Sequence, residues 1–286
     1  MKILIFLAFS FNLFAIDKLI YGEDNRKEAD AYSDIYLKSL SRSVSAMIPL
    51  ENLKKTSNGF KISRKVKSLQ DSYGFCEGER FSEQPTAAIC TGFLVAPKIM
   101  VTAGHCYIEE KKACQKNVWV FDYKSSQLGE FPNENIYRCK KILKRTFENA
   151  GVDFTIVELD REVTDRKPLN LSAHRPVEGI PLVIMGYPMG LPIKIADGGE
   201  VLAVKDTFFQ ANLDSFEGNS GSPVFNKGNG EVEGILVRGN PDYTREGNCK
   251  KANHCDDNGE NCEVKGRLLA EEVVTVDNIL AFLSEI

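Results

Sequence analysis

Short apolar or alternating runs, separated by Gly, Pro, Asn and Asp, recur along most of the chain. Alternation of apolar and polar residues between frequent turn residues is typical of β-strands. The runs that we expect to form strands are Ser45–Ile48, Ala87–Val95, Val118–Tyr123, Phe154–Leu159, Leu182–Gly186, Glu200–Ala203, Thr207–Gln210, Ser222–Phe225 and Val232–Arg238. Many short strands with turns between them predict an all-β fold, either a sandwich or a barrel.

The C-terminal part of the chain departs from this pattern. Its last apolar residues recur at roughly helical spacing: Val273, Val276, Ile279, Leu280 and Leu283. This spacing predicts a helix at the C-terminal end. The preceding segment, from Gly239 to Lys265, is rich in Asn, Asp, Gly and Cys. Such a composition predicts a long, exposed loop that is cross-linked by disulfides.

The N-terminus carries the pattern of an export signal. Met1 and Lys2 precede an apolar run from Ile3 to Phe14, and the small residue Ala15 follows. One positive charge, a short apolar stretch and a small residue are typical of a secretory signal peptide. The alternative is an N-terminal buried strand. We expect a signal peptide over residues 1–15, and either a short propeptide or an N-terminal extension over residues 16–41.

Composition and charge exclude some classes of partner. The 286 residues are 43% hydrophobic, which is enough for a sizeable core, and the net charge is −4. No basic patch stands out, so we expect no nucleic-acid partner. No segment after the signal is long and apolar enough to span a bilayer, so we expect no membrane anchor. The sequence therefore predicts a secreted or periplasmic protein, which we expect to be a monomer.

The cysteines support export. They are Cys76, Cys90, Cys106, Cys114, Cys139, Cys249, Cys255 and Cys262. An even number of cysteines in an exported chain predicts up to four disulfides. The alternative is a zinc site at Cys249, His254, Cys255 and Cys262, because these residue types ligate zinc. No Cys-x2-Cys pair is present and export favours oxidation, so we expect neither a metal nor another cofactor.

Three stretches contain the residue types of nucleophilic catalysis: Cys90–Cys106, which holds His105; Gly151–Val157, which holds Asp153; and Glu217–Phe225, which holds Ser220. A serine hydroxyl is a weak nucleophile and needs an adjacent base. Histidine suits this task near neutral pH, and a carboxylate on its other ring nitrogen fixes the tautomer. We expect His105 to be the base and Asp153 to orient it.

The turn around Ser220 is rich in glycine. Gly218 and Gly221 flank the Asn219-Ser220 pair, and glycines permit backbone conformations that other residues resist. Such a turn can direct the N–H groups of Gly218 and Ser220 towards one point. Two donors there would bind the oxyanion of a tetrahedral intermediate. On its own this stretch could be a plain turn, and the histidine and aspartate stretches make the catalytic interpretation stronger.

Together the three stretches resemble those of the chymotrypsin-fold serine peptidases. Thr102-Ala-Gly-His105-Cys106 resembles the histidine motif of that family, and Gly218-Asn-Ser220-Gly-Ser-Pro-Val resembles its bacterial glutamyl-endopeptidase-like and Htr-like branches. The order His, Asp, Ser also matches. An α/β-hydrolase would have the order Ser, Asp, His and a glycine two residues after the nucleophile, where this chain has Ser222.

The resemblance implies an architecture. We expect an all-β fold of two six-stranded antiparallel β-barrels with a C-terminal helix, built by residues 42–286. His105 and Asp153 would belong to the first barrel and Ser220 to the second. The resemblance also implies a disulfide between Cys90 and Cys106. We expect a second one between Cys114 and Cys139, and leave the pairing of the other four cysteines open.

The assignment of Asp153 has competitors: Asp122, Asp160, Asp165 and Asp214. Asp153 is preferred because it precedes Phe-Thr-Ile-Val, which resembles the strand of the family that carries the triad aspartate. The residue before the serine also differs from the trypsin-like pattern. Asn219 is neutral, whereas trypsin-like members have an Asp there that pairs with a newly formed N-terminus. We infer that activation does not require this ion pair.

Two interpretations of the pocket for the P1 side chain, which precedes the scissile bond, stay open. Asp214 lies six residues before Ser220, where the resemblance implies selection of Arg or Lys, and Glu271 and Glu272 would also favour a cation. Leu236 stands where glutamyl endopeptidases often have a histidine. Arg238 could pair with Asp214 or recognise an acidic side chain. We expect a basic P1 residue, with an acidic one as the alternative.

Substrate backbone should pair with Val237, Arg238 and Gly239 as an added strand. The sequence therefore predicts a secreted serine endopeptidase that hydrolyses polypeptides through an acyl-enzyme. A catalytically inactive peptide-binding homologue and a secreted esterase are the alternatives. Labelling of Ser220 by an organophosphonate separates the first alternative, and a preference for short acyl esters without proteolysis would favour the second.

Overall fold

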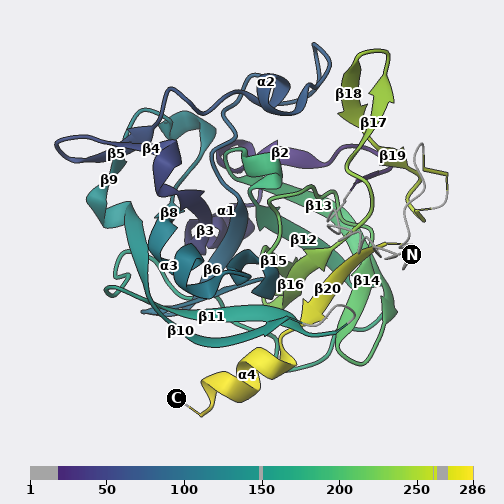
Figure 1. Ribbon diagram of the computed structural model, residues 1–286. Helices are drawn as coiled ribbons and strands as arrows, with labels where there is room; N and C mark the ends of the chain where they lie inside the picture. The colour runs from purple at the N-terminus through teal and green to yellow at the C-terminus, as the bar shows by residue number, and fades with distance from the viewer. Residues whose placement is uncertain (1–18, 148–150, 260, 263–269, 286) are drawn as a thin grey trace, which may run out of the picture.

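The first half of the chain builds a closed β-barrel (Figure 1). The computed structural model describes residues 19–147, 151–259, 261–262 and 270–285. Around this barrel the strand order is β10-β11-β7-β6-β3-β8, and every neighbouring pair is antiparallel. The strands are β3 (Val44–Pro49), β6 (Cys90–Ala96), β7 (Ile99–Thr102), β8 (Asn117–Phe121), β10 (Ile136–Phe147) and β11 (Asp153–Leu159).

The second half builds another closed barrel of six antiparallel strands, in the order β12-β15-β16-β20-β14-β13, with β13 pairing back to β12. The strands are β12 (Pro181–Gly186), β13 (Lys194–Val204), β14 (Phe208–Ala211), β15 (Pro223–Asn226), β16 (Val232–Arg238) and β20 (Glu271–Thr275). One buried apolar cluster contains residues from both barrels, among them Val120 and Val183. The barrels therefore share a core.

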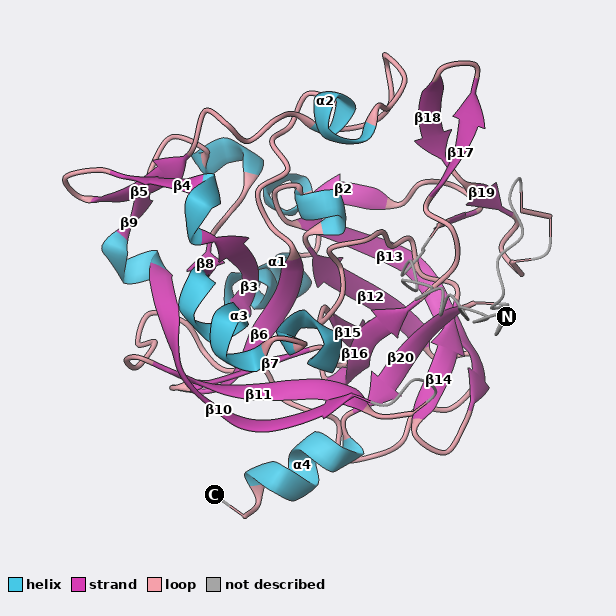
Figure 2. Cartoon of the chain, viewed as in Figure 1, coloured by secondary structure: helices cyan, strands magenta, loops and turns pink. Residues whose placement is uncertain are grey.

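Smaller elements surround the barrels (Figure 2). Strand β2 (Arg26–Glu28) pairs with β13, and β1 (Ile20–Tyr21) pairs in parallel with β19 (His254–Cys255). The other short strands are β4 (Leu53–Lys55), β5 (Gly59–Ile62), β9 (Phe131–Pro132), β17 (Tyr243–Glu246) and β18 (Cys249–Ala252). The α-helices are α1 (Ile35–Leu40), α2 (Leu69–Tyr73), α3 (Glu110–Lys116) and α4 (Asp277–Leu283). None of the helices in the described part of the chain is both long and apolar enough to cross a membrane.

Seven 3-10 turns complete the secondary structure of the described residues: η1 (Ala29–Ala31), η2 (Ser41–Ser43), η3 (Leu50–Asn52), η4 (Gly104–Tyr107), η5 (Ser125–Gln127), η6 (Asn133–Asn135) and η7 (Pro188–Gly190). The turn η4 matters most for the site, because it begins two residues after β7 and contains His105.

The predicted fold class is confirmed, and two local expectations change. Val273, which the helical spacing included, lies in strand β20, and the helix begins only at Asp277. The segment from Gly239 to Lys265 contains the hairpin of β17 and β18. The signal peptide predicted over residues 1–15 lies outside the described residues, whereas residues 19–41 pack against the second barrel through β2.

Four disulfides cross-link the chain. Cys90 pairs with Cys106 and Cys114 with Cys139, which are the two expected pairs. The remaining pairs are Cys76–Cys249 and Cys255–Cys262. Because Cys249, Cys255 and Cys262 are all oxidised in disulfides, the alternative of a zinc site at these residues is wrong. Four disulfides are typical of a protein that folds in an oxidising compartment.

The Cys76–Cys249 bridge is expected to stabilise the fold most, because it joins residues 173 positions apart. Loop-closure entropy predicts that its removal lowers the free energy of unfolding by up to about 5 kcal/mol. Removal of Cys255–Cys262, which spans 7 positions, should cost only about 2 kcal/mol. Urea unfolding of the two double Cys→Ser variants measures both values. Equal losses would contradict the argument from loop length.

Candidate active site

His105 and Asp153 form a tightly coupled pair in the first barrel. His105 Nδ1 lies 2.8 Å from Asp153 Oδ2, and the backbone N–H of His105 donates to Asp153 Oδ1 at 3.1 Å. Asp153 is the first residue of β11 and is 1% exposed. A Cβ atom at Gly104 would lie 2.0 Å from the carbonyl oxygen of Thr146, so only glycine lets the histidine turn approach the end of β10 this closely.

Ser220 belongs to the segment between β14 and β15 of the second barrel and is fastened to the first barrel beside His105. The N–H of Thr91 donates to the Ser220 carbonyl at 2.9 Å. The same carbonyl lies 3.8 Å from the sulfur of Cys106, the residue after His105. The Cys90–Cys106 disulfide fixes these neighbours. The interface between the barrels thus brings the three predicted triad residues into one region.

His105 Nε2, the atom that would exchange a proton with Ser220, makes no hydrogen bond to the serine. His105 Nε2 is buried and has no hydrogen-bond partner within the described ranges. Ser220 is itself buried, at 4% exposure. Hydrogen bonds at catalytic groups are often long or poorly aligned before substrate binds. The arrangement therefore leaves Nε2 available as an acceptor.

The turn before Ser220 has an unusual backbone. Gly218 has φ of +89°, and a Cβ there would lie 2.5 Å from the carbonyl oxygen of Tyr187. Thr91 Oγ1 donates to the Gly218 carbonyl at 2.9 Å, which turns that oxygen towards the first barrel. Among the described residues, no acceptor binds the backbone N–H of Gly218 or of Ser220. Two unpaired donors remain on one turn.

Asn219 is buried between these two residues, and its interactions are local. Its N–H donates to the Phe216 carbonyl at 3.0 Å, and its Oδ1 accepts from Ser222 Oγ at 3.3 Å. A neutral side chain of this kind forms no ion pair. The turn must therefore be held by other contacts.

Asp214, expected near the P1 pocket, is bound by the N-terminal segment. The N–H of Tyr21 donates to Asp214 Oδ1 at 2.8 Å, and the N–H of Asn25 donates to Oδ2 at 2.6 Å. The side chain is buried, and burial raises the pKa of Asp214 to about 7, although both hydrogen bonds oppose that rise. Both carboxylate oxygens already have donors.

Arg238 does not pair with Asp214, so that expectation is wrong. Its Nε donates to Glu272 Oε2 at 2.5 Å, and its Nη2 donates to the carbonyl of Gly151 at 3.2 Å. The guanidinium thus links β16 to the segment just before Asp153. Ser215 Oγ donates to Glu271 Oε2 at 2.8 Å. The three acidic residues expected around the P1 pocket each have a partner.

The predicted substrate-pairing segment lies at the end of β16. Val237 is fully buried, whereas Arg238 and Gly239 are half-buried. The strand ends at Arg238, so Gly239 lies outside the ladder between β16 and β20.

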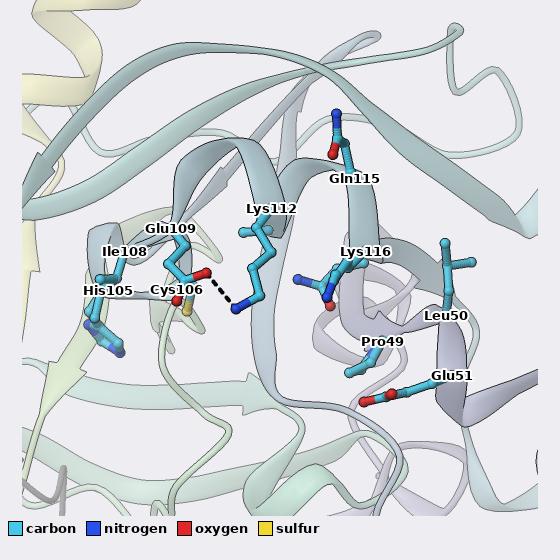
Figure 3. Close-up of a pocket in the computed structure, with 12 residues that line it drawn as sticks. Pro49, Leu50, Glu51, His105, Cys106, Ile108, Glu109, Lys112, Gln115 and Lys116 are labelled. Carbon is cyan, nitrogen blue, oxygen red and sulfur yellow. Dashed lines mark ion pairs between the residues drawn. The ribbon is translucent and has the colours of Figure 1, made fainter.

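A cavity of about 510 Å³ lies beside His105, which is one of its lining residues (Figure 3). The loop at Pro49–Glu51, the turn η4 and helix α3 line it. Figure 3 shows the ion pair between Glu109 and Lys112, whose charged atoms are 2.5 Å apart, at its edge.

Two further residues support the histidine and were not found from the sequence. Arg145 Nε donates to the carbonyl of Gly104 at 2.8 Å, directly before His105. The ring of Phe147 lies 6.2 Å from the His105 ring, between centroids. Both residues lie on β10, which no predicted run covered, and a lone Arg or Phe in a mixed segment carries no signal of its own.

Comparison with known proteins places the chain in a family. The model of the trypsin-like peptidase domain matches residues 90–235, just over half of the chain and all three candidate triad residues. The protein belongs to the trypsin-like peptidase family. No curated protein sequence matches it significantly.

Two solved structures are similar at low sequence identity. A Glu endopeptidase in complex with MPD is 15% identical, with a TM-score of 0.49, over 82% of this chain and 94% of that chain. An inactive serine-to-alanine mutant of Rv3671c from M. tuberculosis H37Rv is 13% identical, with a TM-score of 0.48, over 94% of this chain and 96% of that one. The assignment to the family rests on the domain match.

Proposed function

We propose that the protein is a secreted serine endopeptidase in which Ser220 attacks the peptide carbonyl, His105 transfers the proton and Asp153 orients His105. The observation that carries this proposal is the 2.8 Å contact between His105 Nδ1 and Asp153 Oδ2, beside a serine anchored at Cys106. The carboxylate holds the proton on Nδ1, so Nε2 faces the serine as a base.

The reaction proceeds in two steps at these atoms. His105 Nε2 takes the hydroxyl proton as Ser220 Oγ forms a bond to the carbonyl carbon, and then gives that proton to the departing amine. A water molecule, activated in the same way, hydrolyses the acyl-enzyme. The leaving chain would depart past the cavity lined by α3.

The unpaired N–H groups of Gly218 and Ser220 support an oxyanion hole. Charge develops on the carbonyl oxygen as the tetrahedral intermediate forms, and fixed donors stabilise it without reorganising. The positive φ of Gly218 gives the turn the backbone conformation in which we expect its N–H to bind the oxyanion.

Gly218→Ala is expected to lower kcat by about 10²–10³, because a Cβ would strain the turn and misalign one oxyanion donor. Steady-state kinetics on a peptide substrate measures the change, and near-ultraviolet circular dichroism checks the fold. Gly228→Ala is the matched control, since its Cβ would meet only the Asn226 side chain, at 3.3 Å. Full kcat in the Gly218 variant would contradict the oxyanion assignment.

The test of the function is covalent labelling followed by proteolysis. A biotinylated organophosphonate should form an adduct on Ser220, detected by mass spectrometry, and the purified protein should cleave casein. Absence of both on folded protein would favour the inactive, peptide-binding alternative. An adduct together with hydrolysis of short acyl esters only would favour an esterase.

The proposal also includes secretion of the protein and its preference for one kind of P1 residue. The apolar N-terminus and four disulfides support export, and N-terminal sequencing of exported protein should place the first cleavage after Ala15. The basic P1 residue stays a prediction, with an acidic one as its alternative. Mass spectrometry of a digested peptide library decides between them.

A further inference from the structure

Residues 19–28, which we call the N-terminal strap, run along the second barrel. Sheet pairing holds this segment at two places: β1 pairs with β19, and β2 pairs with the first three residues of β13 (Figure 1). Leu19 and Ile20 are fully buried. The strap is therefore an integral part of the folded protein.

Along its length, the strap contacts three consecutive residues of the segment that leads to Ser220. The N–H of Ser215 donates to the Leu19 carbonyl at 3.2 Å. The carboxylate of Asp214 accepts the N–H groups of Tyr21 and Asn25, one on each oxygen. These contacts fix the chain four to six residues before the serine.

The third contact is a stacked cation. The Arg26 guanidinium lies 4.2 Å above the ring of Phe216 and 5.4 Å from that of Phe81. Asp24 holds it in place, with Nε–Oδ1 and Nη2–Oδ2 distances of 2.8 and 2.7 Å. A cation over an aromatic face is attracted by the negative face of the ring, and more strongly when it is shielded from water. The ring of Phe216, which is itself buried, is thereby held on the face that Arg26 covers.

Phe216 is the first residue of the turn over residues 216–220, which we call the oxyanion turn. Its carbonyl accepts the N–H of Asn219 at 3.0 Å, closing the turn that carries the free donors of Gly218 and Ser220. Since Asn219 is neutral, no ion pair anchors this turn from within. The contacts at residues 214–216 hold the segment that leads into the turn, in addition to the hydrogen bonds from Thr91 to the carbonyls of Gly218 and Ser220.

We propose that the N-terminal strap orders the oxyanion turn, and that Asp214 is a positioning residue whose carboxylate binds the peptide N–H groups of Tyr21 and Asn25 rather than a P1 cation. This inference rests on the proposed peptidase function, and it assigns Asp214 a role that is independent of substrate charge. The two roles differ in a measurable way. A carboxylate that recognises P1 affects only cationic substrates, whereas an anchor of the turn affects all substrates alike.

The first experiment compares kcat/KM of Asp214→Ala and Asp214→Asn on four peptides that differ only in P1: Arg, Glu, Leu and Ala. Loss of hydrogen bonds to a charged group predicts a reduction of roughly 10- to 100-fold for Asp214→Ala, of similar size on every peptide on which the unaltered protein is active. Asp214→Asn keeps one acceptor oxygen and should lose less. Asp165→Asn, in the connection between β11 and β12, is the matched control and should keep full activity.

The second experiment measures the order of the oxyanion turn directly and does not depend on peptidase activity. Hydrogen exchange followed by mass spectrometry should show faster exchange in a peptide covering residues 214–221 of Asp214→Ala and of Arg26→Met. A peptide covering β8 should exchange unchanged in both. Arg26→Met keeps the apolar stem and removes the charge above Phe216, so it tests the strap even if the Asp214 variant misfolds.

The outcomes separate this inference from the proposed function. A loss confined to the Arg peptide, or unchanged exchange at residues 214–221 in both variants, would overturn the inference while leaving the peptidase intact. A protein that cleaves nothing and takes no organophosphonate would refute the proposed function, and the exchange experiment would still decide whether the strap orders the turn.

Discussion

Ser220→Ala is expected to lower kcat by about 10⁶ while leaving the fold unchanged. The hydroxyl is the atom that forms the acyl-enzyme, and removal of the nucleophile of a triad costs about this much. Its carbonyl, which accepts the Thr91 N–H and approaches Cys106, is retained in alanine. The loss therefore reports on chemistry rather than on the junction of the barrels.

Ser222→Ala is the matched control, because it removes a hydroxyl two residues away in the same turn. The hydrogen bond that Ser222 Oγ donates to Asn219 Oδ1 is long, at 3.3 Å, so its loss should disturb the turn only slightly. Active-site titration with the organophosphonate should label the Ser222 variant and the unaltered protein but not the Ser220 variant. Casein cleavage by purified Ser220→Ala would mean that another residue is the nucleophile.

Most strands could be predicted because each has one face in a barrel core. The run Val232–Arg238 became β16 with the same bounds, and Phe154–Leu159 lacks only the first residue of β11. Strand β10 was missed because it is long and half-exposed, with charged residues interrupting its alternation. At the C-terminus, the apolar positions of a short strand and a following helix combined into one apparent helical period, which placed Val273 in the wrong element.

The residues of the site also differ in whether the sequence around them could reveal their contacts. His105 and Ser220 could be found from the sequence because each lies in a short motif, and the other residues of that motif are also close to it in the structure. The partners of Asp214 are different, because Tyr21 and Asn25 lie 193 and 189 residues away and contribute backbone N–H groups that no side-chain pattern reveals. One of the two alternatives for Arg238, an ion pair with Asp214, is likewise wrong, since the register between β16 and β20 places Arg238 opposite Glu272.

Asp153→Asn is expected to lower kcat by about 10⁴. The structure shows why an isosteric change should be so costly. One oxygen of Asp153 accepts the backbone N–H of His105, which can only donate. An asparagine must therefore place its oxygen there and turn its NH₂ group towards His105 Nδ1. That group can only donate, so the imidazole must carry its proton on Nε2, where it cannot accept one from Ser220.

Asp160→Asn is the control among the competing carboxylates, because Asp160 accepts the N–H of Arg138 on the far end of the same hairpin. Its kcat should stay within a few-fold of the unaltered protein. Single-turnover acylation should be slowed in Asp153→Asn by the same factor as kcat, with KM little changed, since the defect lies in proton transfer and not in binding. If Asp160→Asn shows the 10⁴-fold loss and Asp153→Asn does not, the orienting carboxylate has been misassigned, although the 2.8 Å contact to His105 Nδ1 argues for Asp153.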